Sequence, residues 1–102
     1  MQLLEQGDYY QKVAEGKVVV EFFAPWCEPC KHLQATLEKL ESNFDDFVFY
    51  KLDTDKNSDI VRRLRVLSIP TIYIYQGGIK VKEINGVWPY ENIAAVLARL
   101  TD

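Results

Sequence analysis

The chain has 102 residues, a formal net charge of −3 and an apolar share of 48%. This length suits one domain with a hydrophobic core and is short for two, so we expect a single domain over residues 1–102. The net negative charge gives no electrostatic reason for nucleic acid or an anionic membrane surface as the main partner. No apolar run in the sequence approaches the about 20 residues that span a bilayer.

The first eight residues contain neither a basic region nor a long apolar stretch. We therefore expect no signal peptide and a cytoplasmic location. The sequence has 2 cysteines, too few for a disulfide scaffold. In the reducing cytoplasm, a cysteine pair is more often catalytic than structural.

The first third of the chain predicts a strand, a helix and a second strand. Gln2–Leu4 is a candidate short edge strand. Asp8 is the expected N-cap of a helix that runs to about Glu15 and stops at Gly16. Residues 17–23 are β-branched, aromatic and apolar on both faces, which predicts a central strand covered on both sides.

The middle of the chain alternates helix and strand. From Cys30, apolar residues recur at helical spacing, and the helix is expected to end near Asn43. The apolar positions of this helix are Leu33, Leu37, Leu40 and Phe44. Phe47–Leu52 predicts the next strand, and Asn57-Ser58 starts a short helix through about Leu64.

The last third predicts a hairpin and a final helix. Strands over Thr71–Tyr75 and Ile79–Ile84 are joined by a turn at Gln76-Gly77-Gly78. Pro89 suits the first turn of the last helix. The order predicts an α/β fold: a mixed five-stranded sheet, parallel in its N-terminal part and antiparallel in its C-terminal hairpin, flanked by four helices.

The two cysteines, Cys27 and Cys30, lie between a predicted strand and a predicted helix start. A helix N-terminus carries partial positive charge and unpaired N–H groups, which stabilise a thiolate, the form that attacks disulfides. A second thiol one turn later can close an internal disulfide and release a product. Half of a metal site is the alternative, but zinc needs four ligands and only His32 is near. A metal cluster bridged between two chains stays open.

Several motifs resemble the thioredoxin family over nearly the whole chain. They are Trp26-Cys27-Glu28-Pro29-Cys30-Lys31, Lys51-Leu52-Asp53, Ser68-Ile69-Pro70-Thr71, Gln76-Gly77-Gly78 and Asn85-Gly86-Val87. The resemblance implies the thioredoxin fold and thiol–disulfide exchange, with Cys27 as the exposed attacking thiolate and Cys30 as the buried resolving thiol. It implies a cis Pro70 that presents the Ile69 backbone to an extended substrate. The implied substrate-binding residues are Trp26, Pro29, Ile69, Pro70, Gly86 and Val87.

Glu21 is a carboxylate inside an otherwise apolar strand. Burial raises a carboxyl pKa toward the range of a base at neutral pH. We interpret Glu21 as the proton shuttle for Cys30 and Lys51 as the charge that tunes it. A strand-end glutamate that reaches solvent is the alternative.

Three positions bear on the subfamily. Thioredoxins usually carry Asp where this chain has Glu21, and Glu resembles the protein disulfide isomerases. Pro29 favours a reductase, because the isomerases resemble one another in a Cys-x-His-Cys motif, with histidine at this position. Glu28 stands where Gly is usual. We expect its charge to disfavour the thiolate and make the couple slightly more reducing, or else to act only in partner selection.

The predicted function is protein-disulfide reduction through Cys27 and Cys30 in cell redox homeostasis and electron transport. The chain needs no cofactor, because the electrons travel on the two sulfurs. The expected partners are protein disulfides and a thioredoxin reductase, and the expected state is a monomer. An oxidase or isomerase of the same fold and a non-enzymatic docking module that uses Trp26, Ile69 and Val87 stay open as alternatives. Trp26 itself is expected to be a contact residue, with partial burial as its alternative.

Overall fold

A computed structural model describes residues 1–100 of the chain; the last two residues of the expected domain 1–102 lie outside the described part. The predicted order of strands and helices is confirmed, with one added 3-10 turn, η1. In chain order the elements are β1 (Gln2–Leu3), η1 (Gln6–Asp8), α1 (Tyr9–Val13), β2 (Lys17–Phe23), α2 (Glu28–Asn43), β3 (Phe47–Asp53), α3 (Ser58–Leu64), β4 (Thr71–Gln76), β5 (Ile79–Asn85) and α4 (Tyr90–Arg99).

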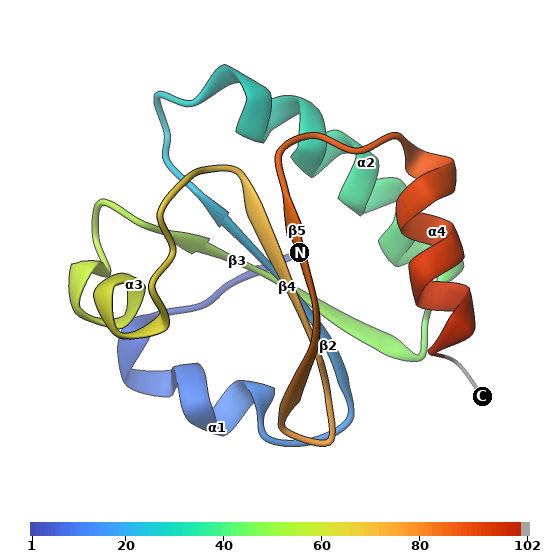
Figure 1. The fold of residues 1–102 in the computed structure, drawn as a ribbon, viewed down its shortest axis with the longest axis horizontal. Helices are drawn as coiled ribbons and strands as arrows, with labels where there is room; N and C mark the ends of the chain where they lie inside the picture. The colour runs from blue at the N-terminus through green and yellow to red at the C-terminus, as the bar shows by residue number, and fades with distance from the viewer. Residues whose placement is uncertain (101–102) are drawn as a thin grey trace.

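The sheet has five strands in the order β1-β3-β2-β4-β5. β3 pairs in parallel with both β1 and β2. β4 pairs antiparallel with both β2 and β5. The strand that is apolar on both faces, β2, therefore lies in the centre as predicted. Figure 1 shows α1 and α3 on one side of the sheet and α2 and α4 on the other.

Each face of the sheet has its own hydrophobic cluster, and successive residues of β2 alternate between them. Val18, Val20 and Phe22 belong to the cluster that includes Tyr9, Val13 and Ile60 from the side of α1 and α3. Val19 belongs to the cluster that includes Leu33 and Leu37 of α2 and Ile93 and Leu97 of α4. This period-2 alternation places Glu21 on the α2 side, between Val19 and Phe23.

The first helix has its N-cap position where predicted but ends earlier than predicted. Asp8 makes no side-chain capping bond, and the helix stops at Val13 rather than near Glu15. The reason is that Asp8 has helical backbone angles, φ −105° and ψ −4°, as the last residue of η1. Asp8 therefore occupies the predicted N-cap position, but its side chain does not cap the helix, because a capping side chain needs an extended N-cap backbone.

Other boundaries move by one or two residues. α2 begins at Glu28, before the predicted start at Cys30. Pro89 precedes α4 as its N-cap, with an extended backbone, and is not part of the first turn. The turn between β4 and β5 is as predicted: Gly77 and Gly78 have φ of +61° and +83°, the left-handed angles that a two-residue type I′ turn requires. Within the described residues, no helix has the length and apolarity that a membrane crossing needs.

Candidate active site

Cys27 and Cys30 form a disulfide where β2 leads into α2, with their Cα atoms 5.3 Å apart. Cys27 is the N-cap of α2, and its Sγ accepts a hydrogen bond of 3.2 Å from the backbone N–H of Cys30. The N–H of Cys27 donates to the carbonyl oxygen of Ala24 at 3.1 Å, which closes the turn before the helix. The prediction that this sulfur lies at a helix N-terminus is confirmed.

Both cysteines are buried in this disulfide form. The exposed fraction is 5% for Cys27 and 2% for Cys30. The expectation that Cys27 is exposed is therefore wrong for the oxidised protein. The physical reason is packing: both residues join Ala24 in one small cluster, against which the half-buried side chains of Phe23 and Ile69 pack.

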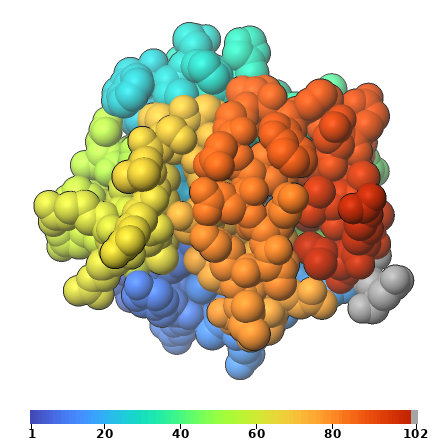
Figure 2. Space-filling model, viewed as in Figure 1, coloured from blue at the N-terminus to red at the C-terminus, as the bar shows by residue number. Residues whose placement is uncertain are grey.

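Three loops meet at the end of the sheet where the disulfide lies. They are the β2–α2 loop, the α3–β4 loop and the β5–α4 loop (Figure 1). In the space-filling view their light-blue, gold and orange atoms adjoin at the top of the molecule (Figure 2). A hydrogen bond of 2.9 Å from the N–H of Gly86 to the carbonyl oxygen of Pro70 joins the last two loops. Gly86 adopts φ +84°, a left-handed angle that favours glycine at this junction.

The Ile69–Pro70 peptide bond is cis, as the resemblance implied. Thr71 fixes this turn, because its Oγ1 donates to the carbonyl oxygen of Ser68 at 2.7 Å. Within residues 1–100, neither the N–H nor the C=O of Ile69 has a hydrogen-bond partner. The Ile69 backbone is therefore available to an added strand beside the disulfide.

Trp26 lies on the surface beside the disulfide with 69% of its area exposed. Its partial burial, the alternative interpretation, is excluded. Its Nε1–H donates to Asp55 Oδ2 at 2.9 Å. The sequence analysis missed Asp55, because no local pattern indicates a bond between two loops 29 residues apart. Val87 is 47% exposed on the other side of the site.

Glu21 has no exposed surface, and neither carboxylate oxygen has a hydrogen-bond partner among the described residues. The alternative that it reaches solvent is excluded. Burial raises the pKa of Glu21 to about 8, while the charge of Lys51 opposes this rise and that of Glu38 adds to it. At neutral pH the side chain is thus mainly a neutral acid that can give up or regain a proton.

Lys51 lies directly opposite Glu21 in the β2–β3 register. Its Nζ lies 5.8 Å from the centroid of the Phe23 ring. Phe23 follows Glu21 on the same face of β2 and packs against the two cysteines. Glu21 and Lys51 are therefore neighbours in the sheet, and Phe23 links them to the two cysteines.

Glu28 is the first residue of α2 and forms an ion pair of 3.1 Å with Lys31. The side chains of Glu28 and Lys31 are 72% and 61% exposed, so water screens their charges. Pro29 is exposed beside Glu28 in the first turn, where its missing N–H costs no helical hydrogen bond.

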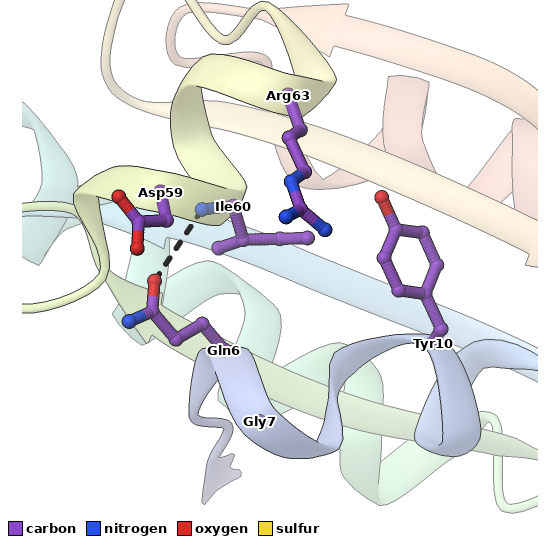
Figure 3. Close-up of a pocket in the computed structure, with 6 residues that line it drawn as sticks. All are labelled: Gln6, Gly7, Tyr10, Asp59, Ile60 and Arg63. Atoms are coloured by element: carbon purple, nitrogen blue, oxygen red, sulfur yellow. Dashed lines mark hydrogen bonds between the residues drawn. The ribbon is translucent and has the colours of Figure 1, made fainter.

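A separate cavity of about 360 Å³ lies between η1, α1 and α3. Figure 3 shows Arg63 of α3 and Tyr10 of α1 on one side of it, and the bond of 3.4 Å from the N–H of Ile60 to Gln6 Oε1 on the other. Neither cysteine nor Trp26 lines it. Over residues 1–100, no group of three His, Cys, Asp or Glu side chains has a metal-binding arrangement.

Comparison with known proteins gives a consistent result. The family model described as thioredoxin matches residues 1–99. The chain belongs to the thioredoxin family. It is 41% identical to thioredoxin-2 of Saccharomyces cerevisiae over 90 residues, 86% of each chain. It is 37% identical to a thioredoxin of Staphylococcus epidermidis over 92 residues, 89% of this chain and 88% of the relative.

Solved thioredoxin structures share the fold. The chain is similar to Plasmodium falciparum thioredoxin with a TM-score of 0.88 and 25% identity, covering 97% of this chain and 98% of that one. It is similar to the oxidised form of mitochondrial thioredoxin 3 of Saccharomyces cerevisiae with a TM-score of 0.87 and 28% identity, covering 96% and 94%. With its cysteine pair, this member of the thioredoxin family is a thiol–disulfide oxidoreductase, a protein-disulfide reductase in redox homeostasis.

Proposed function

We propose that the reduced Cys27–Cys30 pair reduces protein disulfides in two exchange steps. The Cys27 thiolate attacks one sulfur of the substrate disulfide, whose S–S bond breaks as the other substrate sulfur leaves. The Cys30 thiolate then attacks Cys27, breaks the mixed disulfide and releases the second substrate thiol. Two electrons pass to the substrate, and the Cys27–Cys30 bond forms.

The observation that carries this proposal is the hydrogen bond of 3.2 Å from the Cys30 N–H to Cys27 Sγ at the start of α2. The same N–H is available to the Cys27 thiolate of the reduced protein. Charge on sulfur gains more from such a donor than neutral sulfur does, and the helix dipole adds to the effect. This favours Cys27 over Cys30 as the attacking group.

Glu21 acts as the proton shuttle for the second step. Cys30 must lose its proton to attack Cys27, and the ionised fraction of Glu21 can accept it. Glu21 is a buried carboxyl with no hydrogen-bond partner among the described residues. Lys51 tunes Glu21, because its positive charge favours the ionised carboxylate.

Substrates dock on the three loops around the disulfide. The extended segment of the substrate pairs with the free backbone of Ile69, which cis Pro70 presents. Trp26, Pro29, Gly86 and Val87 supply the surrounding contact surface. The exposure of Trp26 and Val87, 69% and 47%, supports this role.

We further propose that the protein is a cytoplasmic monomer and that residues 1–102 form one domain. The disulfide is reset for each turnover by an external donor, a thioredoxin reductase, so the protein serves in electron transport. A reducing compartment keeps the thiols of such a pair reduced. No cofactor takes part within the chain, because the two sulfurs hold the electrons.

Capture with Cys30→Ser tests the proposed function. This variant lacks the resolving thiol, so a native lysate is expected to yield mixed disulfides between Cys27 and protein partners, released by dithiothreitol. A double variant, Cys27→Ser with Cys30→Ser, is the matched control and captures none. Absence of dithiothreitol-sensitive partners on Cys30→Ser would contradict the proposal. A reduction potential near −270 mV, as in thioredoxins, supports a reductase, while one near −180 mV or higher indicates an oxidase or isomerase.

A further inference from the structure

β5 is an edge strand of the sheet, and two of its large apolar side chains stand in water. It is the last strand in the order β1-β3-β2-β4-β5, so no strand among the described residues pairs with its outer side. Backbone N–H and C=O groups on such an edge are open to an added chain. The exposed apolar side chains are Ile79 and Val81, at 68% and 42%.

A groove of about 170 Å³ lies between β5 and the last turn of α4. Its apolar lining consists of Val81, Val96 and Leu100, and its other lining residues are Lys82 and Arg99. The volume exceeds the about 150 Å³ of an apolar cavity that accommodates benzene, so a leucine side chain fits. Figure 2 shows the orange atoms of β5 beside the red atoms of α4 on the visible face.

The groove is cationic, although the whole chain has a net charge of −3. Within the described residues, no acidic side chain lines it. Lys82 lies 5.7 Å from the centroid of the Trp88 ring but has no ion-pair partner in the part of the chain that the structure describes. Arg99 has no ion-pair partner there either. Charge complementarity therefore favours a ligand that carries carboxylates on both sides of an apolar side chain.

A second copy of this chain does not complement the groove. A twofold contact brings the same patch of two copies together. Lys82 and Arg99 of one copy would then face the same cations of the other, with no carboxylate of the groove between them. Lysine on an edge strand also discourages pairing between identical edges. An acidic segment gains energy from the same cations that repel a second copy.

We propose that β5 and α4 bind an extended acidic segment of a partner protein. The segment adds a strand to the edge of β5 and inserts one apolar side chain into the groove. Carboxylates two residues before and after that side chain meet Lys82 and Arg99, because side chains two residues apart in a strand share a face.

This surface is separate from the loops around the disulfide. Neither cysteine lines the groove, and neither Trp26 nor Ile69 does. A partner bound there leaves the dithiol accessible. The inference therefore does not depend on the proposed function and adds a binding activity to it.

Three synthetic peptides without cysteine test the inference by titration into the isotope-labelled, oxidised protein. The first is acetyl-Thr-Glu-Thr-Leu-Thr-Glu-Thr-amide. The second has lysine in place of both glutamates, and the third has serine in place of leucine. Shifts of the backbone amide resonances report both the site and the Kd. We expect the acidic leucine peptide to shift the amides of residues 79–84 and 96–100 and to bind about tenfold more tightly than either of the others.

Charge reversal of the groove provides the matching variant. Lys82→Glu combined with Arg99→Glu is expected to reverse the preference, so that the lysine peptide binds about tenfold more tightly than the acidic one. Lys12→Glu combined with Arg63→Glu is the control, since it changes the net charge equally at exposed positions of α1 and α3. This control should keep the wild-type preference. The amide spectrum of each variant shows that the fold is retained.

Several results would overturn the inference. One is an acidic peptide that shifts no amides of β5 and α4, or that shifts those of the loops around the disulfide instead. Equal binding of the three peptides is another, and so is a charge-reversed variant that keeps the wild-type preference. Sedimentation of the protein alone checks the other occupant: a dimer whose β5 amides shift on dilution would identify a second copy in place of an acidic partner.

Discussion

Glu21 and Lys51 lie directly opposite each other on β2 and β3, yet the carboxylate accepts no hydrogen bond from the ammonium or from any other described residue. The buried carboxyl is therefore influenced by the lysine charge without being fixed in an ion pair. An ion pair would hold the carboxylate ionised. The looser arrangement leaves the pKa of Glu21 at about 8, where burial outweighs the attraction to Lys51.

The first prediction concerns stability and pH. With a folded-state pKa of about 8 and an ordinary value of 4.5, Glu21 keeps its proton in the folded protein but loses it in the unfolded chain between these values. The contribution of the neutral carboxyl to the free energy of unfolding is complete below about pH 4.5 and is lost as pH rises through about 8. Between these pH values, the free energy of unfolding falls by up to about 1.4 kcal/mol for each pH unit.

Urea unfolding of wild type and Glu21→Gln across pH 4 to 9 measures this slope. The difference in unfolding free energy between the two is expected to shift in favour of Glu21→Gln as pH rises. Glu91→Gln, an exposed substitution on α4, is the control and should follow the wild type. Parallel curves for wild type and Glu21→Gln would show that Glu21 titrates normally.

The second prediction concerns the resolving step. Glu21→Gln removes the proposed proton acceptor for Cys30, so release of the mixed disulfide is expected to slow by about 100-fold. Acid quench and mass spectrometry during a single turnover should then show the Cys27 mixed disulfide accumulating. Glu21→Asp keeps a carboxyl and should accumulate less of it. Equal, undetectable accumulation in wild type and Glu21→Gln would remove Glu21 from the mechanism.

The third prediction concerns Glu28. We expect its negative charge next to Cys27 to disfavour the thiolate, and its ion pair of 3.1 Å with Lys31 to neutralise this charge in part. Glu28→Gly and Glu28→Gln are both expected to make the reduction potential less negative, by on the order of 10 mV given solvent screening. Lys31→Gln should shift it in the opposite direction. Titration against glutathione measures these shifts, and an unchanged or more negative potential in Glu28→Gly would leave partner selection as its role.

The fourth prediction concerns the end of α3. Arg65 has φ +58°. This angle is energetically unfavourable for an ordinary L-residue and nearly neutral for glycine. Arg65→Gly is expected to raise the free energy of unfolding by about 0.5–1 kcal/mol, after the greater freedom of glycine in the unfolded chain is included. Arg63→Gly, inside α3, should instead lower it by a similar amount. Thermal and urea unfolding of both variants test the contrast, which fails if Arg65→Gly is the less stable of the two.

Much of the fold could be predicted because the sequence signals were local and agreed with one another. Val18, Val19 and Val20 identify a strand buried on both faces, and the glycines at 77 and 78 identify a tight turn. Asp8 occupies its predicted N-cap position without a capping bond, since the preceding 3-10 turn fixes its backbone in helical angles. Local preference decides such a position only where tertiary structure does not.

The site was predicted less completely because parts of it depend on contacts between distant loops. Nothing near Trp26 in the sequence indicates Asp55. That Ile69 lies at the two cysteines followed from the family resemblance and not from a local pattern near Cys27.

In the proposed mechanism, Cys27 Sγ caps α2 and is therefore the sulfur that ionises and attacks. Alkylation of the reduced protein by iodoacetamide, with each cysteine quantified by mass spectrometry across pH 5 to 10, tests it directly. We expect Cys27 to react first and to reach its half-maximal rate at a lower pH than Cys30, because the helix N-terminus favours its thiolate. Faster labelling of Cys30, or a Cys27 that stays unreactive through neutral pH, would contradict the account.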